Sequence, residues 1–206
     1  MVFDYSDAPF RIPDYKAEAH RGAWRYMAEP GSWWTGAERV AIAAASRAAH
    51  DCPLCRERKA SLSPNAVQGT HAGPVGDLAA RVVDAVHRIS TDPARLTGTW
   101  VESLIDDAFT YGHYVEMVSV IVNLTSIDSL HHALSLPLEP LPEPVAGEPD
   151  RYLPPGAAID VAWVPMIYPE KLTEPEADIC FGAPRMGHVI RAMSLVPDAV
   201  RWLNKL

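Results

Sequence analysis

A run of prolines near the middle of the chain sets the first limit on its fold. Between residues 136 and 157 the prolines are Pro137, Pro140, Pro142, Pro144, Pro149, Pro154 and Pro155. A proline has no backbone N–H and a fixed φ, so a stretch this rich in proline forms neither a helix nor a central strand. We therefore predict an extended linker over residues 136–157, between an N-terminal part (residues 1–135) and a C-terminal arm (residues 158–206).

The N-terminal part has the signals of a helical bundle. Thr35 and Glu38 have the spacing of a capping box, and an alanine-rich run of high helix propensity follows to about Ala49. Pro53 suits the first position of the next helix. Further helices are expected over about 15–28, 53–61, 77–90 and 112–134, with short ones after Asp92 and after a second capping-box signal at Thr99. The predicted fold class is all-α, with a helical domain over about residues 15–135.

The C-terminal arm is less regular. Residues 158–168 form one of the few β-like runs in the chain, and two short helices broken at Pro197 are expected between residues 187 and 206.

Composition narrows the class of protein. The 206 residues carry a net charge of −8, with 18 Lys and Arg against 26 Asp and Glu, and no basic stripe, which argues against nucleic-acid binding. No stretch reaches the roughly 18 consecutive apolar residues of a membrane helix. Residues 1–10 contain Asp4 and Asp7 and lack an apolar signal core, so we expect a cytoplasmic protein without a membrane partner.

Cys52 and Cys55 form a C-x-x-C pair at the predicted start of a helix. The N–H groups and the dipole of a helix N-terminus favour the thiolate. Arg56, Arg58 and Lys59 follow at once and add positive potential. A thiolate attacks peroxides and disulfides, and oxidation to a sulfenic acid lets the neighbouring thiol close a disulfide. The pair therefore indicates redox chemistry.

Two other interpretations of the pair stay open. A structural zinc needs four ligands, usually two further Cys or His at matched spacing. There is no second C-x-x-C and Cys180 stands alone, although His50 or His71 could be recruited. The cysteines could also be unrelated core residues. We rank both below the redox pair and expect no metal and no other cofactor.

Three segments resemble one known family. They are residues 38–59, residues 82–97 (VVDAVHRISTDPARLT) and residues 113–138 (HYVEMVSVIVNLTSIDSLHHALSLPL). In this order they resemble the alkylhydroperoxidase D-like and carboxymuconolactone decarboxylase-like family, in particular its peroxidase-related members. The C-terminal arm resembles the leader that precedes the helical domain in those members. Two explanations of this arm stay open: the chain is a shortened form of a fused two-domain protein, or the arm packs on its own bundle or on a partner's, which we favour.

The resemblance implies a fold, an activity and partners. The fold is the all-α bundle of that family, and the activity is that of an antioxidant thiol peroxidase or disulfide oxidoreductase. Cys55 would attack a small hydroperoxide, and Cys52 would resolve the product as a redox-active disulfide. A small thiol or thiol protein would be the reductant, and the chain would form a dimer or larger homo-oligomer.

The chain departs from the family motif E-x11-C-x-x-C-x-x-x-H. Val40 stands at the position of the glutamate, Lys59 at that of the final histidine, and Leu54 replaces a histidine between the cysteines. The family's proton relay therefore does not carry over. Candidate substitutes are His50, Glu38, Glu116 and His131.

The last two candidates belong to the predicted long helix. At 100° per residue Glu116, Asn123 and His131 fall within about 80° on one face. Ordinary hydrogen bonds between helices, or a dimer contact, explain such a face better than a relay does. Asp128 with His131 and His132 is a weaker possibility for a metal site.

Three functions are left to compare. The rival to the redox enzyme is a non-catalytic helical scaffold or redox sensor that has lost the relay. A lactone decarboxylase ranks last, because that chemistry does not use a C-x-x-C.

Overall fold

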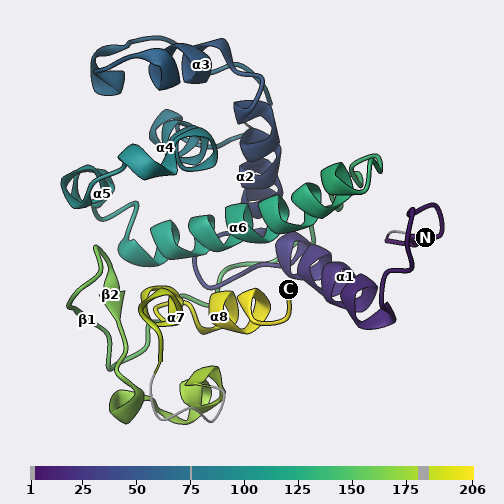
Figure 1. Ribbon diagram of the computed structural model, residues 1–206. Coiled ribbons are helices and arrows are strands. Elements are labelled where there is room, and N and C mark those ends of the chain that lie inside the picture. The colour runs from purple at the N-terminus through teal and green to yellow at the C-terminus, as the bar shows by residue number, and fades with distance from the viewer. Residues whose placement is uncertain (1–2, 75, 181–185) are drawn as a thin grey trace.

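The computed structural model describes residues 3–74, 76–180 and 186–206, and helices dominate it (Figure 1). The N-terminal part contains α1 (Asp14–Ala28), α2 (Gly36–Ala49), α3 (Pro53–Ala60), α4 (Ala80–Thr91), α5 (Gly98–Leu104) and α6 (Tyr111–Ala133). The C-terminal arm contains α7 (His188–Met193) and α8 (Pro197–Leu203). Single turns of 3-10 helix lie at η1 (Pro64–Ala66), η2 (Pro93–Arg95) and η3 (Pro169–Lys171), and a longer 3-10 segment at η4 (Glu174–Cys180). The all-α prediction is confirmed.

Several helices begin where local sequence signals place them. The Thr35 hydroxyl accepts from the N–H of Glu38, and the Glu38 carboxylate accepts from the N–H of Thr35, so the predicted capping box of α2 is present. Pro53 is the first residue of α3. Pro197, expected to break the last helices, is the first residue of α8. These are the positions at which side-chain chemistry alone determines a helix start.

Three local predictions were wrong. The cap of α5 is Thr97, whose hydroxyl accepts from the N–H of Trp100, and not Thr99. The expected helix after Asp92 is the single turn η2. The β-like run forms only two-residue strands, β1 (Ala158–Ile159) and β2 (Pro165–Met166), paired antiparallel. For α5 both threonines are plausible caps and the structure uses the earlier one, whereas η2 and the two strands form inside the expected segments but are shorter than expected.

Helix α6 crosses the middle of the molecule, with α2 and α4 on one side and α7 and α8 on the other (Figure 1). Its residues Met117, Leu124 and Ile127 are fully buried against α2 and α4, where Ile42 and Val86 belong to the same core. A helix that is apolar on most sides is expected to be enclosed by others.

The core also contains a buried ion pair. The Arg39 Nε donates to Glu116 Oε1 at 2.6 Å, and both side chains are almost completely buried. Arg39 also donates to the carbonyls of Tyr26 and Glu29. A Cβ at Gly31 would lie 1.9 Å from an Arg39 nitrogen, so only glycine leaves room for this pair.

The proline-rich segment forms no helix or strand and lies along the bundle. The N–H of Val145 donates to the carbonyl of Ala28, and the N–H of Arg151 donates to that of Ser32. The arm that follows forms a second apolar cluster with Val115 of α6, and Trp202 of α8 stacks on Tyr26 at 5.7 Å between ring centroids. Among the residues described, no helix is long and apolar enough to cross a membrane.

Residues 52–79, which we name the Cys–His lobe, contain α3, η1 and a long irregular loop. The lobe lies beyond the end of α2, at the edge of the bundle (Figure 1). Its apolar cluster is small, with Cys52, Leu54 and Cys55 buried and Val67 packed against them. Few apolar contacts are therefore available to hold its loop in place.

Candidate metal and thiol site

The cysteine pair lies at the start of α3, directly after the short turn that follows α2. Cys52 is the N-cap residue of α3, and Cys55 lies in its first turn. The exposed fraction is 0% for Cys52 and 5% for Cys55, and both are free thiols. Bulky substrates are therefore kept away from both sulfur atoms.

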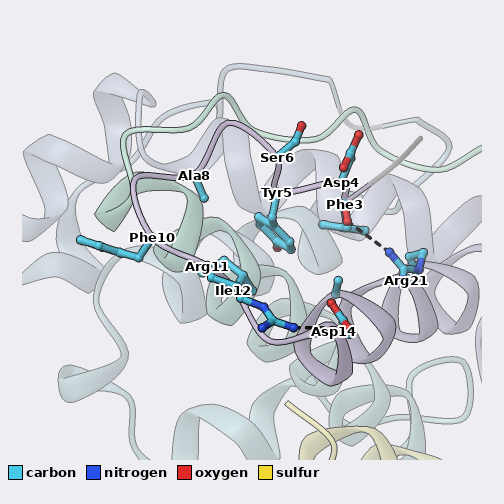
Figure 2. Close-up of a pocket in the computed structure, with 11 residues that line it drawn as sticks. Phe3, Asp4, Tyr5, Ser6, Ala8, Phe10, Arg11, Ile12, Asp14 and Arg21 are labelled. Carbon is cyan, nitrogen blue, oxygen red and sulfur yellow. Dashed lines mark hydrogen bonds and ion pairs between the residues drawn. The ribbon is translucent and has the colours of Figure 1, made fainter.

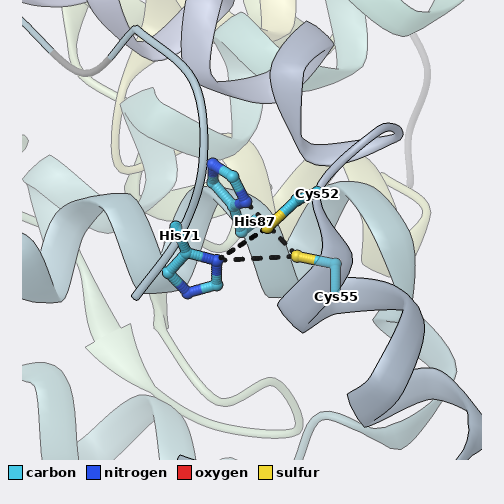
Figure 3. Close-up of side chains that lie close together, drawn as sticks. All are labelled: Cys52, Cys55, His71 and His87. Carbon is cyan, nitrogen blue, oxygen red and sulfur yellow. Dashed lines mark hydrogen bonds between the residues drawn. The ribbon is translucent and has the colours of Figure 1, made fainter. Parts of the chain in front are cut away.

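Two histidines from distant parts of the chain meet the thiols (Figure 3). His71, in the loop of the lobe, places its Nδ1 3.6 Å from Cys52 Sγ and 3.6 Å from Cys55 Sγ. His87, on α4, places its Nδ1 3.3 Å from Cys55 Sγ. They stand 16 and 32 residues after Cys55.

The four side chains converge on one point. One ligand atom from each of Cys52, Cys55, His71 and His87 lies within 4.8 Å of all the others. Zinc bonds of about 2.3 Å to sulfur and about 2.0–2.1 Å to nitrogen, at tetrahedral angles, place S and N about 3.6 Å apart. The observed S···N distances of 3.6, 3.6 and 3.3 Å have this size.

The surroundings shift the pKa values of the two thiols in opposite directions. Burial raises the pKa of Cys52, but the Ala72 N–H, the backbone of Cys55 and the His71 side chain outweigh it and lower this pKa to about 7. Burial and the neighbouring Cys52 raise the pKa of Cys55 to about 11. Hydrogen bonds to the charged form thus favour a thiolate at Cys52.

The histidines also differ. Burial, followed by the charge of His71, lowers the pKa of His87 to about 4, so His87 is neutral near pH 7. Burial lowers the pKa of His71 too, but its hydrogen bond to Asp84 prevails and the net shift is upward. That bond joins His71 Nε2 to Asp84 Oδ1 at 2.9 Å.

The relay candidates from the sequence have other contacts. Glu38 caps α2, and Glu116 pairs with Arg39 in the core. His50 is exposed at the end of α2, beside a surface hollow that Asp128 and His132 also line. None of these three is in the cluster around the thiols. The imidazoles that lie there are those of His71 and His87, and the carboxylate behind His71 is that of Asp84.

His131, the fourth candidate, belongs to the contacts of the N-terminal segment. Its Nε2 lies 3.1 Å from the Tyr5 hydroxyl, which also bonds to His20, and its Nδ1 lies 2.7 Å from the carbonyl oxygen of Pro137. Beside Tyr5, this segment and α1 enclose a cavity of about 480 Å³ (Figure 2). His131 thus helps to hold the segment around Tyr5 against the bundle and does not contact the thiols.

Sequence reasoning named His71 only as a possible recruit and did not consider His87. The signal for His87 was weak, because it follows Val83 and Val86 on the buried side of α4, where a histidine is easily taken for a core residue. The spacing also differs from the short H-x₃₋₅-H pattern of familiar zinc sites. Only the packing of the loop against α4 brings these histidines to the pair.

Comparison with known proteins adds no identification. No family model, no curated protein and no solved structure matches this chain.

Proposed function

We propose that this chain is a zinc protein in which Cys52, Cys55, His71 and His87 bind one Zn²⁺ ion. The supporting observation is the convergence of these four side chains, with S···N distances that fit a tetrahedral ion. Four protein ligands complete the tetrahedron, and such closed sites are structural. The metal would tie the Cys–His lobe to α4. On this proposal the protein corresponds to the non-catalytic helical alternative of the sequence analysis.

Metal content tests this proposal. The full-length protein, purified under reducing conditions, is expected to hold about one zinc per chain after gel filtration, measured by elemental analysis. Cys52→Ser and His87→Ala each remove a ligand, so each is expected to bind the metal more weakly and to retain little of it through gel filtration. Cys180→Ser and His50→Ala are matched controls outside the cluster and should retain it. A wild-type protein that takes up neither Zn²⁺ nor Co²⁺ overturns the proposal.

A second candidate is the thiol peroxidase suggested by the family resemblance. It is favoured by the chain of contacts from Asp84 through His71 to Cys52, which supplies a carboxylate and an imidazole beside a thiol. In the metal-free protein a thiolate attacks the O–O bond of hydrogen peroxide, giving a sulfenic acid and hydroxide, which is protonated to water. The second thiol then attacks that sulfur, releases a second water and forms the Cys52–Cys55 disulfide.

The contacts favour Cys52 as the attacking thiolate, whereas the resemblance assigns that role to Cys55. A cavity of about 20 Å³ is lined by Cys55 and not by Cys52, so it lies beside the thiol that the resemblance names. It is large enough for a water-sized molecule, so hydrogen peroxide suits it better than a bulky organic hydroperoxide.

His87 separates the two candidates, because the peroxidase does not use it. For the peroxidase, metal-free His87→Ala keeps its turnover of hydrogen peroxide with a dithiol reductant, and Cys52→Ser and Cys55→Ser each abolish it. Turnover that survives both cysteine changes excludes this candidate.

A further inference from the structure

Asp84 lies on α4, one helical turn before His87, and contacts neither thiol. Its Oδ1 lies 2.9 Å from His71 Nε2 and accepts from Arg58 at 2.5 Å, while its Oδ2 accepts from Arg88 Nε at 2.7 Å. Both carboxylate oxygens are therefore used, and the direction of the carboxylate is fixed.

The hydrogen bond to Asp84 determines what His71 presents to the thiols. With its proton on Nε2, directed at Asp84, the ring leaves the lone pair of Nδ1 free, and this nitrogen is equally distant from both sulfur atoms at 3.6 Å. A carboxylate behind a histidine ligand holds the ring orientation and increases its basicity.

His87 lacks such support. Its Nδ1 faces Cys55, but its Nε2 is buried without a hydrogen-bond partner among the residues described. The two histidines are thus positioned in different ways, His71 by a charged hydrogen bond and His87 by the packing of α4.

We infer that Asp84 is a positioning residue of the zinc site that acts through His71 and not through His87. The inference rests on the proposed function, since it assumes that the four side chains bind the metal. Arg58 and Arg88 orient Asp84 and balance its charge, and Arg58 belongs to α3 of the Cys–His lobe. Asp84 therefore connects α4, α3 and the His71 loop around one metal ligand.

The test is the zinc affinity of the full-length protein, measured by competition with a chelator. Asp84→Ala is expected to weaken binding by roughly 10–100-fold, and Asp84→Asn by less, because its amide oxygen can still accept from His71. The matched control is Asp128→Asn, which breaks the bidentate Arg47–Asp128 ion pair away from the site and should leave the affinity unchanged.

A double-mutant cycle distinguishes positioning from a general effect on folding. In a His71→Ala background, Asp84→Ala should change Co²⁺ affinity little further, whereas in a His87→Ala background it should keep its full effect. Equal effects in both backgrounds overturn the inference, as does an Asp84→Ala protein that binds zinc as tightly as wild type. If wild type binds no metal, the proposed function itself fails, which is a different result.

Discussion

The helical bundle and the Cys–His lobe are held together by different chemistry. In the bundle, α1, α2, α4 and α6 share a continuous apolar core that includes Trp24, Ile42, Val86 and Leu124. In the lobe, the local apolar cluster holds only Leu54 and the two cysteines as buried residues, while Leu78 at its end belongs to the core of the bundle. The loop is fixed mainly by polar contacts to Arg58, Asp84 and the thiols.

This difference predicts different dependences on the metal. A region without enough apolar surface to bury needs crosslinks or a metal to stay folded. At Gly73 the loop of the lobe passes close to α2. This residue has a φ of +113°, and a Cβ there would lie 2.4 Å from the Cβ of Ala48. We expect the bundle to fold without metal and the lobe to require it.

The largest expected effect is that of metal removal. Structural zinc contributes on the order of 10 kcal/mol in small zinc domains, so chelation under reducing conditions should unfold the lobe. Hydrogen exchange is expected to show lost amide protection in residues 52–79, with α2 and α6 still protected. Uniform loss of protection, or none in the lobe, contradicts the comparison.

Breaking the buried ion pair should destabilise the bundle and leave the metal site unchanged. Glu116→Ala leaves Arg39 charged and unpaired in the core, which costs about 3–5 kcal/mol in free energy of unfolding. Urea denaturation measures this loss, and the zinc content per folded chain should not change. A variant of normal stability that has lost the metal would place Glu116 in the site.

Acid should weaken the metal-free protein through its buried histidines, among which His20 and His113 lie in the bundle away from the thiols, and His87 beside Cys55 adds to the effect. Burial, then the charge of Lys16, lowers the pKa of His20 to about 4, and burial, then the charge of Arg151, does the same for His113. The unfolded chain, with a histidine pKa near 6.5, binds these protons first. The contribution to stability is therefore complete above about pH 6.5 and is lost as the pH falls toward 4.

Urea midpoints at pH 7.0, 5.5 and 4.5 in metal-free protein measure this loss. His20→Asn should flatten the profile in this range. An unchanged profile would mean that His20 does not titrate in the folded state as described.

The smallest effect concerns the cap of α2. Thr35→Ala removes the acceptor for the N–H of Glu38 and should cost about 1 kcal/mol of unfolding free energy. Thermal denaturation measures the loss, and Thr97→Ala, at the cap of the peripheral α5, is a control of the same chemistry. The other end of α2 lies beside Cys52. Normal zinc affinity in Thr35→Ala would therefore show that the start of α2 does not control the metal site.

Features determined by local chemistry were predictable from the sequence. Thr35 with Glu38, and Pro53, placed the starts of α2 and α3, because a cap or a first-turn proline acts on its immediate neighbours. The start of α5 shows the limit of such local predictions. Both Thr97 and Thr99 are plausible caps, and the structure uses Thr97.

The site was only half predictable. The cysteine pair is contiguous in sequence and was identified, but its partners His71 and His87 depend on how the lobe folds onto α4. Glu116 and His131 were named as relay candidates on one face of the long helix, and neither contacts the thiols. Their partners, Arg39 and Tyr5, come from segments whose packing no local pattern indicates.

X-ray absorption at the zinc edge of the purified, reduced protein tests the central claim most directly. A Cys₂His₂ site predicts two sulfur atoms at about 2.3 Å and two nitrogen atoms at about 2.0–2.1 Å from the metal. A first shell of nitrogen and oxygen only, or a protein that retains no zinc, would contradict it.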